Sequence, residues 1–275
     1  MRYVSFRRPS GIASFGRLDG EQVYDLGGEH GGSLREALAT RIAPESEGAP
    51  LLLASLTLLP VIPDPAKIFC IGLNYASHVA EMGNMQQAYP TVFTRWPDTL
   101  VAHGAPLEKP TATQRFDYEG ELAVIIGRGG RAITRDQALE HVAGYAVFND
   151  ASVRDWQRHS SQFTPGKNFP ATGGFGPALV TPDEIDDLAA LRVQTRLNGT
   201  MMQDQPIADL IFDVPVLIEY LSAFTTLNPG DVIATGTPGG VGDGRKPPVY
   251  LQPGDVVEVS IGTIGTLTNP VIEGR

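Results

Sequence analysis

Short segments in which apolar and polar side chains alternate, or in which apolar side chains run together, recur along the whole chain. Alternation with a period of two is typical of β-strands, because successive side chains of a strand point to opposite faces. The pattern therefore predicts a protein built mainly from strands. We expect these strands over residues 4–7, 12–16, 22–26, 67–72, 121–127 and 145–150.

Helical periodicity is confined to a few segments. Residues 213–226 place apolar side chains at helical spacing on one face, and Asp213 is suited to cap the first turn. Shorter helices are expected over residues 33–39 and 152–159. Strands that outnumber helices in this way predict an α+β fold that is mainly β. The apolar face of the longest helix consists of Val216, Leu217, Tyr220, Leu221 and Phe224.

Turn-forming residues divide the chain. The 31 glycines and 22 prolines exclude a helical bundle and are typical of a turn-rich protein with many strands. Asp19 and Gly20 predict a hairpin between two of the first strands. Pro63, Asp64 and Pro65 then interrupt the pattern. We expect a domain boundary there, with a small N-terminal domain over residues 1–62 and a larger domain over residues 63–275.

Charge and cysteine content exclude several classes of protein. The 275 residues carry a formal net charge of −10, which argues against nucleic acid or an anionic membrane as a partner. The single cysteine, Cys70, rules out a disulfide framework and a cysteine-rich zinc site. The longest apolar stretch, residues 51–62, is shorter than the roughly 20 residues that cross a bilayer. A cytoplasmic protein is expected.

Three acidic residues mark the first candidate site. Glu119 and Glu121 fall on the same face of a predicted strand, and Asp150 ends another. Carboxylates that run into an apolar segment are costly to bury unless a positive charge lies between them. Three of them would suit Mg²⁺ or Mn²⁺. From spacing alone, a solvated strand end is at least as good an interpretation for the two glutamates.

Two further pairs lie at helical spacing. Arg154 and Gln157 are three residues apart and could hold a carboxylate or a keto oxygen beside a metal, although a solvent-facing helix explains them equally well. His78 and Glu81 are also three apart, so the carboxylate could orient the imidazole as a general base needs. Such pairs are common on protein surfaces, so this spacing alone is weak evidence.

Two loops add polar groups. Lys167 lies between turn residues, where it could face a developing oxyanion or only water. Residues 235–242 form a glycine-rich loop that includes Thr237. This loop lacks the lysine of a P-loop and the strand and helix of a dinucleotide site, so nucleotide binding is not supported. Cys70 lies in an apolar run, where a thiol is usually inert.

Together and in this order, these segments resemble the fumarylacetoacetate hydrolase family, and in size the chain is similar to its short acylpyruvase branch. The resemblance covers about residues 63–271, and the first sixty residues are similar to the variable N-terminal domain of that family. Thr94 and Arg95 depart from the pattern, because many members carry a lysine after the preceding Pro-x-x-Phe stretch. The resemblance rests on residues 67–83, 117–127, 144–157, 166–167, 211–221, 229–242 and 253–270.

The resemblance implies a fold, a set of ligands and a set of roles. The fold is a mixed β-sandwich roll, usually in a homodimer. Glu119, Glu121 and Asp150 would bind Mg²⁺ or Mn²⁺, and His78 with Glu81 would activate water. The remaining groups would face the substrate and stabilise an oxyanion; these are Arg154, Gln157, Lys167 and Thr237.

This set of residues predicts a divalent-metal-dependent hydrolase that cleaves a carbon–carbon bond in acylpyruvates or related β-diketo acids. The products would be pyruvate and a carboxylic acid, with the intermediate enolate stabilised by the metal and Lys167. An alternative is a β-keto-acid decarboxylase of the oxaloacetate type, or a tautomerase, that uses the same metal site without water attack. A non-catalytic binding protein that has kept the fold is the third hypothesis.

Overall fold

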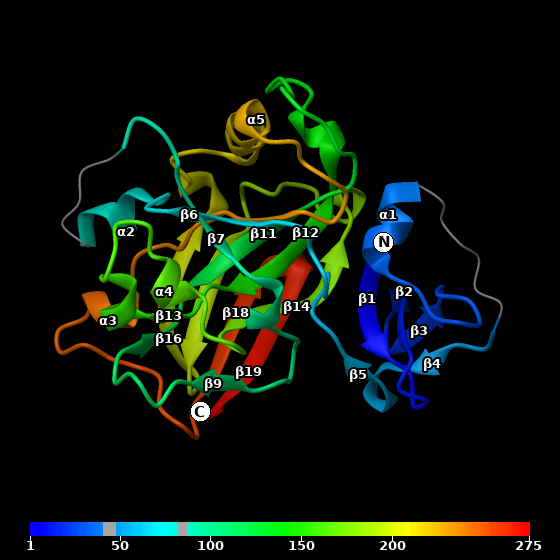
Figure 1. The fold of residues 1–275 in the computed structure, drawn as a ribbon, viewed down its shortest axis with the longest axis horizontal. Helices are drawn as coiled ribbons and strands as arrows, with labels where there is room; N and C mark the ends of the chain where they lie inside the picture. The colour runs from blue at the N-terminus through cyan, green and yellow to red at the C-terminus, as the bar shows by residue number, and fades with distance from the viewer. Residues whose placement is uncertain (41–47, 82–86) are drawn as a thin grey trace.

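The structure, a computed structural model, describes residues 1–40, 48–81 and 87–275 (Figure 1). Residues 82 and 83, at the end of the first segment that carries the family resemblance, lie outside the described residues. Strands dominate and form one large sheet, one smaller sheet and one short pair. The expectation of a mainly β fold with a few helices is therefore confirmed.

The large sheet has the order β4-β3-β2-β1-β14-β12-β11-β17-β6-β7, with β5 paired to β1 and β8 paired to β14. Its central strands β14, β12, β11 and β17 pair antiparallel, whereas β17 and β6 are parallel. The strands of this sheet are β1 Arg2–Arg7, β2 Ala13–Asp19, β3 Gln22–Asp25, β4 Leu51–Leu52, β5 Thr57–Leu58, β6 Ile68–Gly72, β7 Thr91–Arg95, β8 Leu100–Val101, β11 Gly120–Ile126, β12 Val142–Asn149, β14 Gly173–Val180 and β17 Val232–Ala234.

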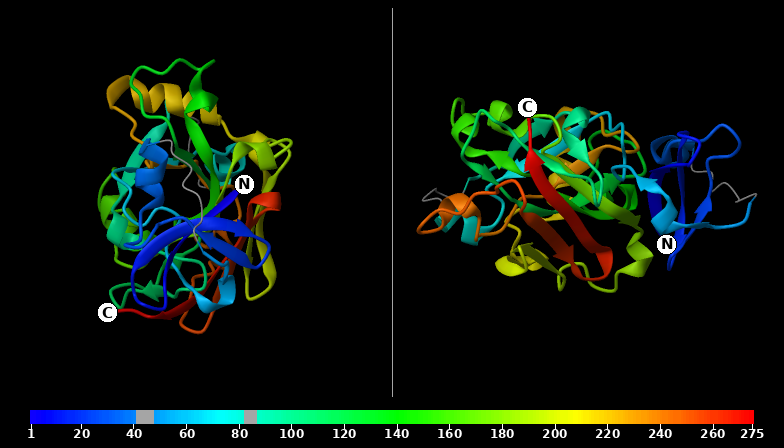
Figure 2. Two further views of the ribbon diagram at one scale, coloured as in Figure 1. Left: turned by 90° about the vertical axis from the view of Figure 1, so that its right-hand side faces the viewer. Right: turned by 90° about the horizontal axis from the view of Figure 1, so that it is seen from below.

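The smaller sheet has the order β16-β15-β18-β19-β9 and packs against the central strands of the large sheet (Figures 1 and 2). Its strands are β16 Thr200–Pro206, β15 Arg192–Leu197, β18 Val256–Ile261, β19 Gly265–Glu273 and β9 Leu107–Lys109. The short pair is β10 Phe116–Asp117 with β13 Ser152–Val153. The helices are α1 Leu34–Thr40, α2 Ala76–Glu81, α3 Arg154–Gln157, α4 Thr164–Lys167 and α5 Val214–Phe224.

The two faces of β11 belong to two different cores, as the alternation in the sequence predicts. Leu122 and Val124 pack in the core that holds α5 and the smaller sheet. Ala123 and Ile125 pack on the opposite face, against β6, β17 and α1. Glu121 lies on the same face as Ala123, because side chains two apart on a strand share a face. The strand thus carries a carboxylate on the face of the sheet that is covered by this second core.

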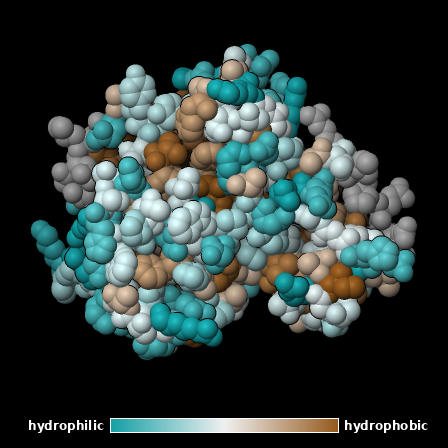
Figure 3. Space-filling model, viewed as in Figure 1, coloured by the Kyte–Doolittle hydropathy of each residue, from teal (hydrophilic) through white to brown (hydrophobic). Residues whose placement is uncertain are grey.

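The N-terminal strands β1–β5 and helix α1 gather at one end of the molecule (Figures 1 and 2). They are joined to the remainder through a sheet contact, in which β1 pairs antiparallel with β14 and Arg2 lies opposite Val180. Figure 3 shows a largely polar surface with apolar side chains near β4, where Leu52 is 61% exposed. The division into domains at residue 62 stays a prediction.

Most of the predicted elements match the structure to within a few residues, including α5. The Asp213 side chain accepts a hydrogen bond of 2.9 Å from the Val216 N–H and so caps this helix. The helix predicted over residues 152–159 is wrong in its first part. Val153 pairs with Phe116 in β10–β13, and only Arg154–Gln157 are helical. Pairing between strands far apart in the sequence overrides the local helical pattern here.

Among the described residues, the structure contains no helix that is both long enough and apolar enough to span a lipid bilayer.

Candidate active site

The ends of β11 and β12 bring the three predicted acidic residues together. The two strands pair so that Glu121 lies opposite Phe148, which leaves Asp150 just beyond the end of β12. The Asp150 backbone N–H donates to the Glu119 carbonyl at 2.8 Å. One carboxylate oxygen from each of Glu119, Glu121 and Asp150 lies within 4.8 Å of the other two, and all three residues are buried. The strand pairing therefore produces a compact set of oxygen donors.

Cationic side chains neutralise two of these three acids. The Lys167 ammonium lies 2.6 Å from an oxygen of Glu119 and 2.6 Å from an oxygen of Asp150. Arg154 binds the other Glu119 oxygen at 2.5 Å, and Arg95 binds the other Asp150 oxygen at 2.7 Å. Burial alone would raise the pKa of Glu119, but the charges of Lys167 and Arg154 outweigh burial and lower its pKa to about 2.

Glu121 is the acid without such a partner. Within the described part of the chain, no ion pair joins it to a cationic side chain, and its carboxylate accepts a hydrogen bond from the Gly236 N–H at 2.9 Å. Burial raises the pKa of Glu121 well above its ordinary value, and the nearby charges of Asp150 and Glu119 raise it further. A buried carboxylate beside two others is stabilised when a cation is shared among them.

The donor set fits a hard divalent cation. The buried cluster holds four carboxylates, Asp117 being the fourth, against the three cationic side chains Arg95, Arg154 and Lys167. With all groups ionised, the cluster carries one negative charge in excess. Mg²⁺ and Mn²⁺ prefer carboxylate oxygens, so Glu119, Glu121 and Asp150 could hold either ion. Such a site would then carry net positive charge and favour an anionic ligand.

Asp117 and Arg154 form a support beneath this cluster, and the sequence assigned no role to Asp117. The fully buried Asp117 carboxylate accepts hydrogen bonds from Arg154 Nε at 2.8 Å and from the backbone N–H groups of Gly242 and Asp243. Arg154 Nη1 in turn donates to Glu119 and, at 3.1 Å, to Gln157 Oε1. Arg154 therefore spans two buried acids and holds Glu119 in position.

This geometry predicts the effect of Arg154→Ala. The substitution leaves two buried carboxylates, Asp117 and Glu119, without their guanidinium, and removing one partner of a buried ion pair typically costs about 3–5 kcal/mol. We expect the free energy of unfolding, measured by urea denaturation, to fall by about that amount. Arg192→Ala is a matched control, because Arg192 pairs with Asp204 at the surface and should contribute below about 1 kcal/mol.

The sequence-based interpretation of Arg154 as a direct substrate ligand makes a different prediction. In that case Arg154→Ala would raise KM and leave the urea midpoint near that of the wild type. A raised KM with unchanged unfolding free energy would therefore contradict the positioning role argued from the structure.

Arg95 is the second support that lacked an assigned role. Its side chain is fully buried and donates to Asp150, to the Ala151 carbonyl at 3.0 Å and to Thr172 Oγ1 at 2.6 Å. The residue is 55 positions from Asp150 in the sequence, so only the fold brings the two together. The departure from the family pattern at this position is the signal that could have drawn attention to it.

His78 and Glu81 face the acidic cluster from the opposite side, on helix α2. His78 Nδ1 lies 3.7 Å from the nearer Glu81 oxygen, and the His78 side chain is 8% exposed. Glu81 also accepts hydrogen bonds of 3.0 and 3.1 Å from the Gly240 N–H. Burial alone would raise the pKa of Glu81, but His78 and the Gly240 N–H lower it. The helical spacing thus predicted a pair that the structure brings together, with His78 lining the cavity.

The glycine-rich loop over residues 235–242 connects the two halves of the site. Its N–H groups reach Glu121 from Gly236, Ser77 from Gly239 and Glu81 from Gly240. Gly236 and Gly240 have φ of +105° and +100°, which L-residues rarely adopt. A Cβ on Gly240 would lie 2.2 Å from the Met202 carbonyl oxygen. The sequence did not predict these hydrogen bonds, because any residue except proline can donate a backbone N–H.

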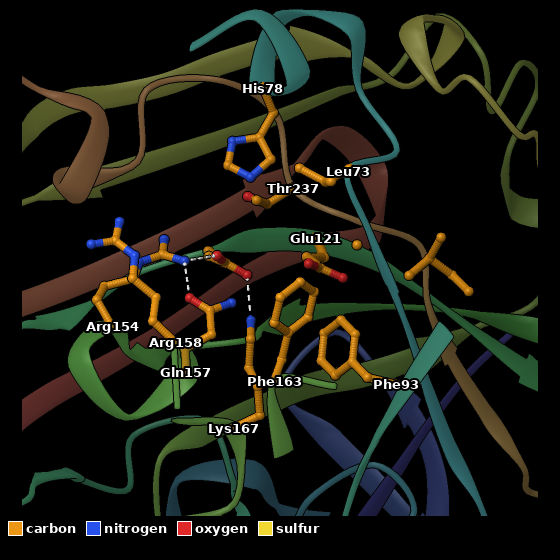
Figure 4. Close-up of a pocket in the computed structure, with 13 residues that line it drawn as sticks. Leu73, His78, Phe93, Glu121, Arg154, Gln157, Arg158, Phe163, Lys167 and Thr237 are labelled. Atoms are coloured by element: carbon orange, nitrogen blue, oxygen red, sulfur yellow. Dashed lines mark hydrogen bonds and ion pairs between the residues drawn. The ribbon is translucent and has the colours of Figure 1, made fainter. Parts of the chain in front are cut away.

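These groups surround a cavity of about 300 Å³. Figure 4 shows the His78 ring on one side, the two aromatic rings of Phe93 and Phe163 on another, and the polar side chains of Arg158 and Gln157 opposite the rings. Gln157 accepts from Arg154 through Oε1, so its NH₂ group is the end left for the cavity. The cavity therefore combines an acidic floor, an imidazole, a polar wall and an apolar wall.

The two other predicted residues also line this cavity, and both have partners in the protein. Thr237 Oγ1 donates to the Gly120 carbonyl at 3.0 Å and accepts from Gln203 Nε2 at 2.8 Å. Lys167 donates to Glu119 and Asp150. All nine residues singled out from the sequence thus lie at one site, and their roles in a reaction stay predictions.

Known proteins resemble this chain along most of its length. Residues 67–272 match the family model described as fumarylacetoacetate (FAA) hydrolase C-terminal. The chain is 44% identical to the oxaloacetate tautomerase YisK of Bacillus subtilis over 223 residues, which cover 80% of this chain and 74% of that protein.

Solved structures agree with this match. The fumarylacetoacetate hydrolase from Exiguobacterium antarcticum is 39% identical, with a TM-score of 0.89 and all of both chains covered. The 2-hydroxyhepta-2,4-diene-1,7-dioate isomerase from Mycobacterium marinum is 31% identical, with a TM-score of 0.82 over 99% of this chain and 98% of that chain. The expected family is confirmed, and the chain belongs to the fumarylacetoacetate hydrolase family.

Proposed function

We propose that this protein is a divalent-metal-dependent tautomerase that interconverts the enol and keto forms of a 2-oxo dicarboxylate such as oxaloacetate. The observation that carries the proposal is the buried trio Glu119, Glu121 and Asp150, of which Glu119 and Glu121 line the same cavity as His78. The likeness to an oxaloacetate tautomerase supports the same class of reaction. The alternative stated from the sequence thus becomes the leading hypothesis.

The proposed reaction needs charge stabilisation and one proton carrier. From enol to keto, the C2 hydroxyl loses a proton, C3 gains one, and the carbon–carbon double bond becomes a carbonyl double bond. A divalent cation held by Glu119, Glu121 and Asp150 would act as a Lewis acid that stabilises negative charge on the C2 oxygen. No water molecule is consumed, so the site has to exclude water rather than activate it.

His78 is the proposed proton carrier. Its Nδ1 lies on the Glu81 side, so Nε2 is the nitrogen left to exchange a proton with the substrate. Glu81 is fixed by the Gly240 N–H and would stabilise the imidazolium that forms when His78 accepts a proton. The 3.7 Å separation between the pair would shorten as charge develops, because catalytic hydrogen bonds are often long in ligand-free sites.

The other predicted residues would orient the substrate or the acids. Gln157 would donate its NH₂ group to a carboxylate or keto oxygen of the substrate. Lys167 would hold Glu119 and Asp150 at the spacing that a cation requires, and its charge would add to the stabilisation of the enolate. Thr237 would fix the start of β11 through its hydrogen bond to the Gly120 carbonyl.

Hydrolysis of an acylpyruvate remains the second candidate function. The observation that favours it is the His78–Glu81 pair, because such a pair could also activate water for attack on a distal carbonyl. The relatives that act on oxaloacetate and on a heptadienedioate are a tautomerase and an isomerase, which favours proton transfer over bond cleavage. Homodimerisation and a cytoplasmic location stay predictions.

Removal of metal tests the proposed function. We expect the purified protein to accelerate ketonisation of enol-oxaloacetate, followed by the loss of enol absorbance, and to lose at least about 100-fold of this activity after dialysis against a chelator. Mg²⁺ or Mn²⁺ should restore it. Pyruvate release from acylpyruvates, measured in parallel, should stay near background. Chelator-resistant ketonisation would contradict the proposal, and metal-dependent pyruvate release from acylpyruvates would favour hydrolysis.

A further inference from the structure

The cavity is lined by three cationic side chains, and two of them are buried and form ion pairs within the protein. The Lys167 ammonium donates to Glu119, to the Asp150 carboxylate and to the Asp150 carbonyl. The Arg154 guanidinium contacts Asp117 through Nε and Nη2, and it contacts Glu119 and Gln157 through Nη1. Both side chains are buried and their charges are paired with carboxylates of the protein, so neither can turn toward a second carboxylate of a substrate without leaving a buried acid unpaired.

Arg158 is the third cationic group, and it differs from the other two in burial and in partners. It follows α3 at the edge of the cavity, and its side chain is 51% exposed. Arg158 contacts the Asp243 carboxylate through Nη2. A guanidinium carries five N–H donors, so a contact through one nitrogen leaves most of them available.

Asp243 does not depend on Arg158 for its neutralisation. Its carboxylate also accepts from Arg115 Nη2 at 2.7 Å and from the Tyr250 hydroxyl at 2.6 Å. Arg115 pairs with Asp243 but does not line the cavity, whereas Arg158 does line it. Arg158 could therefore turn toward an incoming anion without leaving a buried charge unpaired. Figure 4 shows its guanidinium on the polar wall, beyond Arg154 and away from the two phenylalanine rings.

We infer that Arg158 binds the distal carboxylate of the substrate and selects 2-oxo dicarboxylates over 2-oxo monocarboxylates. The inference rests on the proposed function for the position of the reacting end, which would lie at Glu119, Glu121 and Asp150. A carboxylate matches the planar fork of a guanidinium and forms two charge-assisted hydrogen bonds with it. The aromatic wall formed by Phe93 and Phe163 offers no donor for such a group, so the distal charge would lie on the side of Arg158.

Two small acids of nearly the same shape test this inference. Oxaloacetate and 2-oxobutyrate share the 2-oxo acid end and differ by a carboxylate or a methyl group at the far end. Metal-loaded enzyme is incubated with each acid in D₂O, and hydrogen–deuterium exchange at C3 is followed by NMR, with the rate without enzyme subtracted. We expect Arg158→Gln to raise KM for oxaloacetate about 10- to 100-fold and to change KM for 2-oxobutyrate less than about twofold.

Two further variants control for charge and for folding. Arg115→Gln removes a different guanidinium from the same Asp243 and should leave the ratio of the two KM values near that of the wild type. Arg158→Lys keeps the charge and should retain most of the preference for oxaloacetate. An unchanged KM ratio in folded, metal-binding Arg158→Gln, or an equal loss in Arg115→Gln, would overturn the inference.

Calorimetric binding separates this inference from the proposed function. If wild-type enzyme exchanged neither acid, tautomerisation would fail as a function. Tighter binding of oxaloacetate than of 2-oxobutyrate that Arg158→Gln abolishes would still support Arg158 as the carboxylate ligand. Equal binding of both acids by the wild type would overturn that role whatever the reaction is.

Discussion

Glu121→Gln is expected to reduce the affinity for Mn²⁺ more than about 100-fold, because it removes the one ligand carboxylate whose charge no side chain of the described protein neutralises. Loss of a residue that merely supports a ligand typically costs 10- to 100-fold, so loss of the ligand itself should exceed this range. The substitution preserves shape, and the new amide oxygen could still accept from the Gly236 N–H. Isothermal titration of metal-free protein with Mn²⁺ measures the effect.

The stability of the metal-free protein makes this prediction sharper. Glu121→Gln should leave the free energy of unfolding unchanged or raise it, since a buried carboxylate without a cationic partner is unfavourable. Glu119→Gln should instead lower it by about 3–5 kcal/mol, because Lys167 and Arg154 would each lose a buried partner. Equal destabilisation by the two variants, or wild-type Mn²⁺ affinity in Glu121→Gln, would show that the assignment of charges in the cluster is wrong.

His78→Gln should reduce kcat for ketonisation by about 10²- to 10⁴-fold, the usual contribution of a general acid–base group. The substitution keeps a polar side chain on α2 but removes the imidazole that is proposed to carry the proton. KM and Mn²⁺ affinity should stay within about twofold of the wild type, because His78 is not among the proposed metal ligands. Steady-state kinetics at saturating Mn²⁺ separates the two parameters.

A second histidine provides the control for this variant. His30 is exposed and lies in the N-terminal part, so His30→Gln should change neither kcat nor KM. A near wild-type kcat in His78→Gln would mean that another group moves the proton. A loss of Mn²⁺ affinity in the same variant would instead assign His78 to the metal site.

The gathering of Glu119, Glu121 and Asp150 was predictable, because it follows from rules that act over a few residues. Alternation along β11 places Glu121 on the Ala123 face, and the end of a second strand supplies Asp150. The proximity of His78 and Glu81 follows from one turn of helix. In each case the sequence encodes the local geometry, and the pairing of β11 with β12 completes it.

The supports of the site were not predictable, because they depend on contacts between distant segments. Arg95 reaches Asp150 across the sheet, and Asp117 meets Arg154 only because β10 pairs with β13. That same pairing replaced the expected helix at Ser152. Backbone N–H groups of the glycine-rich loop act without any characteristic side chain.

The choice between tautomerisation and hydrolysis also lies outside what the sequence pattern decides. Both reactions use a metal held by the same acids and a proton carrier beside it. The two reactions differ in the substrate group that lies beyond the metal, so the residues at that end of the cavity distinguish them. Arg158 is one of these residues, and it was not singled out from the sequence. Arg158 stands out only in the structure, because its side chain is half exposed whereas Arg154 and Lys167 are buried and paired with carboxylates.

The most direct test of the account is a crystal structure of the protein grown with Mn²⁺, with data collected to locate the ion by its anomalous scattering. We expect a single strong peak within bonding distance of one oxygen each of Glu119, Glu121 and Asp150. A map with no peak among these carboxylates, or with the ion bound elsewhere while Lys167 still bridges Glu119 and Asp150, would contradict it.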